Sequence, residues 1–285
     1  MKYFLEHNGK KYSDKDLIDA FYQLGIKRGD ILCVHTELFN FGMPLLSRNE
    51  FLQTILNCFF EVIGKEGTLI MPTFTYSFCK NEVYDKINSK TNMPTFTYSF
   101  CKNEVYDKIN SKTKMGALNE YFRKQTGVKR TNDPIFSFAI KGAKEELFLK
   151  DTTSCFGENC VYEVLTKENG KYMTFGGQGH TLTHYAEEQF NVFYRYHKIF
   201  SGILIDENNI SYNKTISYYV RKLDISSEPN LINIINIVNN TKNFKKNNFA
   251  GDHINIYNAK EYIEILWKKL DINQTILIEN YDTIY

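Results

Sequence analysis

The feature that most constrains the fold is an alternation of buried strands and amphipathic helices in the first quarter of the chain. Residues 31–36 form an apolar run that predicts a buried strand, and residues 48–63 carry apolar side chains at helical spacing. A second apolar run follows at 68–71. Because a strand, a crossover helix and a second strand place the two strands parallel in one sheet, we expect an α/β fold. Its sheet should be mixed and largely parallel, with helices on its faces.

The same alternation continues through the first two thirds of the chain. Further helices are predicted from Ser13 to Gly25, from Gly116 to Gln125, over 159–165 and from Thr183, with strands at 136–140 and 171–175. After about residue 195 the pattern changes to short β-type runs at 203–205, 215–220 and 254–257, followed by a helix at 259–270. We therefore expect two lobes packed as one fold: an α/β lobe over 1–194 and a smaller α+β lobe over 195–285.

A tandem duplication interrupts this pattern. Residues 71–92 and 93–114 have the same sequence except at their last positions, Asn92 and Lys114. Two copies are too few for a solenoid, and near identity indicates a recent duplication. One copy is therefore additional to the ancestral sequence. We expect these additional residues to form an excursion, that is, an extra loop at the surface or over the site.

Composition and charge exclude several classes of protein. Net charge is +2, from 35 basic and 33 acidic residues, which is unlike a nucleic-acid-binding protein. No apolar run approaches the ~18 residues of a membrane span, and no signal peptide precedes the first helix. Six cysteines without a C-x-x-C pair are too few for a disulfide scaffold. We expect a cytoplasmic monomer or small homo-oligomer.

The segment with the clearest chemical content is a glycine-rich turn at 176–179 that opens into a helix. His184 and Glu187 are three residues apart and share a face of that helix. A carboxylate beside an imidazole suits general-base catalysis, although a histidine at a helix start can also be purely structural. His180, His184 and Glu187 offer zinc ligands in principle, but the H-E-x-x-H order is missing, and we predict no metal. The glycines also match a dinucleotide fingerprint only weakly.

Other polar segments follow or precede predicted strands. In chain order the segments are Gly29-Asp30 with Val34-His35-Thr36-Glu37-Leu38, Gly67-Thr68-Leu69-Ile70-Met71-Pro72-Thr73, Met115-Gly116, Arg130 to Gly142, and His180 to Glu187 followed by Tyr194-Arg195. Each alone is explained by turn or cap chemistry. Together they resemble the motifs of the aminoglycoside 3-N-acetyltransferases and the related sugar N-acyltransferases, over about residues 10–270.

The resemblance implies transfer of an acyl group from acetyl-CoA, or another short acyl-CoA, to a primary amine on a sugar. It makes His184 the general base, with Glu187 as the second catalytic residue. It implies an acyl-CoA site formed by His35, Thr36, Glu37, Leu38, Met71, Pro72, Thr73, Ser137 and Phe138, and acceptor contacts from Asp133, Thr181 and Arg195. Because of the duplication, Met93–Thr95 matches the M-P-T motif as well as Met71–Thr73 does.

Three positions depart from the family pattern. Glu37 replaces a serine and brings a carboxylate to the acyl-CoA loop, and Asp133 replaces the histidine of an H-P pair. The acidic residues that resistance enzymes carry after the P-Y-R segment have no clear match, so Glu187 or Asp224 must orient His184.

The sequence favours a nucleotide-linked amino-deoxysugar of surface glycan biosynthesis as the acceptor. Residues 191–285 are balanced in charge, whereas a site for polycationic antibiotics should be acidic, and Lys198, Arg221 and Lys222 can pair with a diphosphate. Aminoglycoside acetylation is the alternative. Two further hypotheses are an acyl-enzyme formed on Cys155 or Cys160, and a CoA- or sugar-binding protein whose catalysis is impaired by the duplicated loop.

Overall fold

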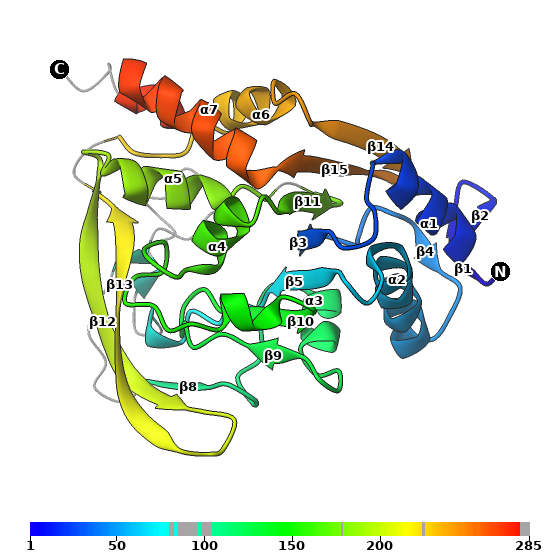
Figure 1. Ribbon diagram of the computed structural model, residues 1–285, viewed down its shortest axis with the longest axis horizontal. Helices are drawn as coiled ribbons and strands as arrows, with labels where there is room; N and C mark the ends of the chain where they lie inside the picture. The colour runs from blue at the N-terminus through cyan, green and yellow to red at the C-terminus, as the bar shows by residue number, and fades with distance from the viewer. Residues whose placement is uncertain (80–82, 85–95, 98–103, 178, 224–225, 280–285) are drawn as a thin grey trace.

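A central seven-stranded sheet organises the computed structural model, which describes residues 1–79, 83–84, 96–97, 104–177, 179–223 and 226–279 (Figure 1). Its strand order is β14-β15-β11-β3-β5-β10-β9. The strands are β3 (Ile31–Thr36), β5 (Thr68–Pro72), β9 (Lys129–Arg130), β10 (Phe138–Gly142), β11 (Lys171–Phe175), β14 (Lys245–Phe249) and β15 (Asp252–Asn258). Parallel pairing joins β11 to β3 and β3 to β5, and the outer neighbours pair antiparallel. The predicted α/β class is confirmed, with the parallel part of the sheet confined to its centre.

Helices cover both faces of this sheet. One face packs on α1 (Asp14–Gln23), α2 (Arg48–Ile63) and α3 (Ala117–Phe122), and the other on α4 (Val161–Lys167), α5 (Leu182–Phe190), α6 (Leu231–Asn239) and α7 (Ala259–Ile272). Alternate residues of β3 enter different cores: Leu32 and Val34 join the first, and Ile31 and Cys33 the second. Since successive side chains of a strand point to opposite faces, a strand buried on both sides carries an unbroken apolar run, as β3 does from Ile31 to Val34.

Local sequence explains the helices that position the site. At α1, Ser13 accepts from the Asp16 backbone N–H, and the Asp16 carboxylate accepts from the Ser13 N–H at 2.7 Å, which completes a capping box. The predicted bounds of α2, β3 and β11 coincide with those observed.

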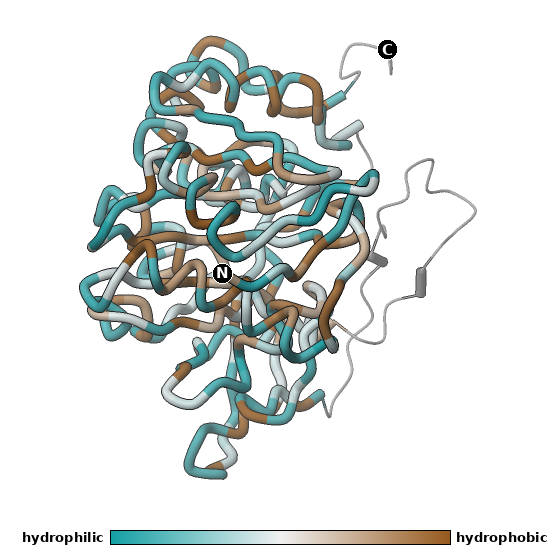
Figure 2. Tube along the Cα trace, turned by 90° about the vertical axis from the view of Figure 1, so that its right-hand side faces the viewer, coloured by the Kyte–Doolittle hydropathy of each residue, from teal (hydrophilic) through white to brown (hydrophobic). Residues whose placement is uncertain are grey.

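Hydropathy follows the same layers. Figure 2 shows apolar segments inside the body and hydrophilic ones at the outer turns. Among the described residues, no helix is both long and apolar enough to cross a lipid bilayer.

The segment after residue 194 is more regular than its sequence predicts. Instead of short runs, β12 (Arg195–Ile205) and β13 (Ser211–Arg221) form a long antiparallel hairpin along one side of the molecule (Figure 1). β8 (Val105–Asp107) extends this hairpin in parallel with β12. The last strands, β14 and β15, join the central sheet through β11. The boundary at residue 194 stays a prediction.

Smaller elements complete the fold. A three-stranded sheet near the N-terminus contains β1 (Tyr3–His7), β2 (Lys10–Ser13) and β4 (Met43–Pro44), and β6 (Val83–Tyr84) pairs with β7 (Phe96–Thr97). The 3-10 turns are η1 (Ser77–Cys79), η2 (Glu145–Phe148) and η3 (Gln274–Leu277).

The duplication contributes to the body from both of its ends. The first copy supplies the end of β5 and η1, and the second copy supplies β8 and the residues up to Lys114. The two ends meet beside β12, since η1 packs against both β8 and β12 and Ile203 donates to the Glu104 carbonyl at 2.8 Å. Within one copy the residues equivalent to Cys79 and Glu104 are three positions apart. The packed part of the fold therefore uses a length of sequence equal to one copy. Met93–Thr95 and most of the expected excursion lie outside the described residues.

Deleting residues 80–101, which rejoins Cys79 to Lys102, should leave a folded and active chain. Every packed residue of 71–79 and 104–114 is retained, and a shorter loop lowers the entropic cost of closure by about 1–2 kcal/mol. We expect an equal or higher midpoint of urea unfolding and unchanged acetyl-CoA turnover. A chain that loses either property would show that the second copy stabilises the fold or serves the reaction.

Candidate active site

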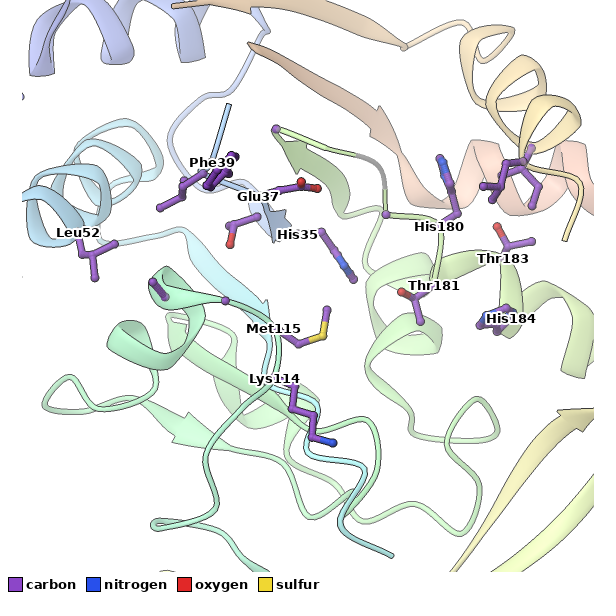
Figure 3. Close-up of a pocket in the computed structure, with 18 of the residues that line it drawn as sticks. His35, Glu37, Phe39, Leu52, Lys114, Met115, His180, Thr181, Thr183 and His184 are labelled. Atoms are coloured by element: carbon purple, nitrogen blue, oxygen red, sulfur yellow. The ribbon is translucent and has the colours of Figure 1, made fainter. Parts of the chain in front are cut away.

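The candidate site lies where β3 and β11 end side by side. From β3 the chain crosses by way of α2 to β5 on one side, whereas β11 pairs on the other side of β3. Ligands of open α/β sheets bind at such a reversal of strand order. A cavity of about 1180 Å³ opens there. It is lined by the loop after β3, by residues 114–117, by the glycine-rich turn with the start of α5, and by Arg195 (Figure 3).

Glycines let the two strand ends approach each other. Gly176 and Gly177 have φ of +74° and +58°. A Cβ on Gly176 would collide with the Glu37 carbonyl oxygen, and one on Gly177 with the Glu37 carboxylate. The Glu37 N–H donates to the Phe175 carbonyl at 2.9 Å, so the two loops are bonded directly. The turn therefore needs glycine both for its backbone conformation and for space.

His184 and Glu187 meet on the first two turns of α5. His184 Nδ1 lies 2.6 Å from Glu187 Oε2, and Arg195 Nη2 lies 3.0 Å from the same oxygen. Tyr194 donates to the other carboxylate oxygen at 2.9 Å. Arg195 Nη2 is also 3.1 Å from His184 Nδ1, but a carboxylate is the stronger acceptor for both groups. We therefore assign the Nδ1 proton to the bond with Glu187, which leaves the lone pair on Nε2.

Burial and charge set the protonation of this cluster. Burial alone raises the pKa of Glu187, but the Arg195 charge and the His184 bond oppose it and lower the pKa to about 2. Burial, and then the Arg195 charge, lower the pKa of His184 below its ordinary 6.5, with Glu187 acting in the opposite direction. At neutral pH the imidazole is therefore neutral and held by an ionised carboxylate.

Several residues predicted for the site line this cavity: His35, Thr36, Glu37, Leu38, Thr181, His184, Glu187 and Arg195. The Arg195 side chain is only 2% exposed and is held by Glu187 and by the Tyr219 carbonyl. Its position is that of a group that fixes Glu187. Asp224, the other acid considered for orienting His184, lies outside the described residues.

A second set of the predicted residues does not line the cavity. Met71, Pro72 and Phe138 belong to the paired ends of β5 and β10. Thr73 and Ser137 lie directly next to these ends, where the Thr73 N–H donates to the Ser137 carbonyl at 2.7 Å. Asn119 links them to the site, since its amide donates to the Pro72 carbonyl at 2.7 Å and its oxygen accepts from Thr36.

Asp133 is buried and does not line the cavity either. Its carboxylate accepts from the Ile135 and Phe136 N–H groups, both at 2.8 Å, and so closes a buried turn. Among the basic residues considered for a diphosphate, Lys198, Arg221 and Lys222 lie on or just after the β12–β13 hairpin, and Arg221 pairs with Glu228 at 2.7 Å.

Three features of the site were not predicted from the sequence. Asn119 is fully buried, and its only signal was a polar residue in an otherwise apolar helix stripe. Tyr162, on α4, bonds His35 from the helix layer that covers this face of the sheet. Lys114, the position at which the two copies differ, lines the cavity, so the copy that ends in lysine supplies this wall.

The other candidate chemistries find less support. Cys155 donates to Asp133 and Cys160 caps α4, and burial raises the pKa of both thiols, which disfavours the reactive thiolate. Within the described ranges, no three His, Cys, Asp or Glu side chains are grouped so that they can hold a metal ion.

The fold is that of the aminoglycoside acetyltransferases. The AAC(3)-IVa apoenzyme is 16% identical over 93% of this chain and 91% of its own, with a TM-score of 0.69. AAC-IIIb, solved as a binary complex with CoASH, is 17% identical over 92% of this chain and 97% of its own, with a TM-score of 0.71. YokD from Bacillus subtilis is 18% identical over 92% and 100%, with a TM-score of 0.69. At these identities the likeness establishes the architecture.

The sequence shows to which family the chain belongs. The family model for aminoglycoside 3-N-acetyltransferase matches residues 33–271, and the chain belongs to that family. It is accordingly an N-acetyltransferase with acetyl-CoA as its donor. The resemblance drawn from the motifs is confirmed.

Replacing Gly176 by alanine should destabilise the protein far more than the same change at Gly9. Both glycines have φ near +75°, but a Cβ on Gly9 meets nothing within 4 Å. Gly9→Ala therefore measures backbone strain alone, about 1–2 kcal/mol, and the collision at Gly176 should add about 1–3 kcal/mol. Urea unfolding of both variants checks this. Equal losses would mean that the two loops separate at little cost.

Proposed function

We propose that this acetyltransferase acts on the primary amine of a nucleotide-linked amino-deoxysugar in surface glycan biosynthesis. The observation that carries the proposal is the charge of the described cavity lining. Its acids are Glu37 and Glu187, and its cations are Arg48, Lys114 and Arg195. Glu187 is matched by Arg195, so one carboxylate faces two cations. An acceptor with several ammonium groups fits such a lining poorly, whereas one with a diphosphate and a single amine fits it better.

Aminoglycoside acetylation is the second candidate. It is favoured by the family match and by the fold shared with AAC-VIa bound to sisomicin, which is 18% identical with a TM-score of 0.71. Glu37 lines the cavity and can provide one contact for an ammonium group of either acceptor (Figure 3).

The proposed mechanism is direct transfer in a ternary complex. A protonated amine has no lone pair, so it must lose a proton before or during attack on the thioester carbonyl. His184 Nε2 is the proposed base, Glu187 orients the ring, and Arg195 with Tyr194 fixes Glu187. The cavity is large enough for the acyl end of the donor and a sugar together. Bringing the amine and the thioester together contributes on the order of 7–11 kcal/mol.

The acyl-CoA is proposed to lie along the loop His35–Leu38, with Thr181 contacting the acceptor. Both segments line the cavity. We place the reaction in the cytoplasm, a proposal supported by the five described cysteines, all of which are free thiols.

An acceptor panel tests the proposal. The purified full-length chain is assayed with acetyl-CoA against dTDP- and UDP-linked amino sugars and against gentamicin and sisomicin, with release of CoA thiol as the readout. We expect kcat/KM for the best nucleotide sugar to exceed that for either antibiotic by at least about tenfold, which is ~1.4 kcal/mol of transition-state binding.

One variant links the panel to the charge of the lining. Lys114→Asn, which introduces the residue of the other copy, should weaken the binding of a diphosphate-bearing acceptor and leave the turnover of gentamicin unchanged. Turnover confined to the antibiotics would overturn the nucleotide-sugar proposal and establish the second candidate.

A further inference from the structure

A second imidazole, that of His35, lies in the same cavity at the end of β3. We propose that His35 is a catalytic residue whose Nδ1–H donates a hydrogen bond to the thioester carbonyl oxygen and stabilises the oxyanion that forms there. The proposal rests on acyl transfer from acetyl-CoA and does not depend on which amine is acylated.

The ring of His35 is fixed from several directions. It is 6% exposed and stacks on Tyr172, with ring centroids 4.9 Å apart and an interplanar angle of 25°. The Gly179 backbone packs against it so closely that a Cβ there would lie 3.2 Å from Cγ and Nδ1. Tyr172 in turn donates to the Gly179 carbonyl at 3.0 Å, which fastens the glycine-rich turn over the imidazole. A preorganised donor needs this kind of immobility.

Tyr162 determines which ring nitrogen carries the proton. His35 Nε2 lies 3.0 Å from the Tyr162 hydroxyl. Burial raises the pKa of Tyr162 well above its ordinary value, while a hydrogen bond with Thr181 acts in the opposite direction, so the phenol keeps its proton. A phenol O–H is a stronger donor than a neutral imidazole N–H, and an imidazole nitrogen is a stronger acceptor than a phenol oxygen, so we assign the Tyr162 hydrogen to the bond with Nε2. A neutral imidazole that accepts at Nε2 carries its hydrogen on Nδ1.

The ring stays neutral at physiological pH. Burial, and then the charge of His180, lower the pKa of His35 to about 3. Such an imidazole is a poor base, but as a neutral N–H donor it can polarise a carbonyl. His35 and His184 therefore have different environments and different roles: one donates to the developing negative charge, and the other accepts the proton.

The Nδ1 edge of the His35 ring faces the cavity. His35 lines the cavity, and no described residue bonds its Nδ1. Figure 3 shows the ring extending from β3 toward the side of the cavity where Thr181 and His184 lie. A thioester carbonyl placed between the two imidazoles would meet the donor on one side and the attacking amine beside His184 on the other.

The amine enters the step as the free base, its ammonium proton having been released to solvent. Its nitrogen attacks the carbonyl carbon, and the π-electron pair moves to the oxygen, which accepts from His35 Nδ1–H. The proton that the nitrogen must lose after attack passes to His184 Nε2. The carbonyl re-forms as the C–S bond breaks, the bond pair leaves with sulfur, and the proton on His184 passes to the CoA thiolate.

Kinetics of His35 variants provide the first test. His35→Phe keeps an aromatic ring on Tyr172 but removes the donor, so kcat should fall about 10²–10³-fold. His35→Gln retains a donor and should recover part of that loss. The KM for acetyl-CoA should change little, and the acidic limb of the pH–rate profile should remain. Loss of that limb in His35→Gln would make His35 the base and overturn the proposal.

A carbonyl probe distinguishes donation from a structural role. The ketone analogue of acetyl-CoA, with a methylene in place of sulfur, is bound to the full-length protein and its C=O stretch is measured by infrared difference spectroscopy. We expect a shift to lower wavenumber in the wild type and in His35→Gln, but not in His35→Phe. An unshifted band in the wild type, or the same shift in His35→Phe, would contradict the proposal.

A matched pair of tyrosine variants tests the tautomer assignment. Tyr162→Phe removes the hydroxyl that directs the proton and should lower kcat several-fold while weakening the infrared shift. Tyr257→Phe is the control, because Tyr257 belongs to the same aromatic cluster but its buried hydroxyl has no partner among the described residues. Equal effects of the two changes would count against Tyr162 as the group that fixes His35.

Discussion

The buried carboxylate of Glu187 is the interaction on which the site depends. A buried charge is tolerated only when it is paired and hydrogen-bonded, and Glu187 meets both conditions through Arg195, Tyr194 and His184. The same arrangement fixes the imidazole and, through the Arg195 charge, helps keep it unprotonated. Removing Arg195 would leave the buried charge unmatched, and removing Tyr194 or His184 would take a hydrogen bond from the carboxylate. The Glu187 side chain therefore serves both the packing of the site and the orientation of the proposed base.

The sheet brings the His184–Glu187 cluster and the His35 imidazole to the same cavity. His184 belongs to the helix that follows β11, and His35 to the end of β3, and the parallel pairing of these strands brings them to one cavity. Glycines at 176 and 177 let the loops approach each other. In our account, the fold provides one imidazole for the proton and another for the oxyanion, and the acyl donor lies between them. Acceptor choice is left to the charges at the rim.

Much of the fold was predictable from the sequence, because the signals are local. The apolar run of β3 and the stripe of α2 predict their own bounds. The long β12–β13 hairpin was predicted only in fragments, because polar residues on its exposed side interrupt the apolar pattern. His184 and Glu187 were identified because they are three residues apart. The support from Asn119 and Tyr162 was not, because those contacts join residues 83 and 127 positions apart.

The central claim is that His184 accepts the amine proton while neutral, and the pH–rate profile of the wild type beside His184→Gln tests it most directly. Because burial and Arg195 lower the pKa of His184, the wild-type kcat/KM should fall only below pH 6.5 and follow one protonation. In His184→Gln the rate should drop about 10²–10⁴-fold and that limb should vanish. A near-normal rate in the variant, or an unchanged acidic limb, would contradict the account.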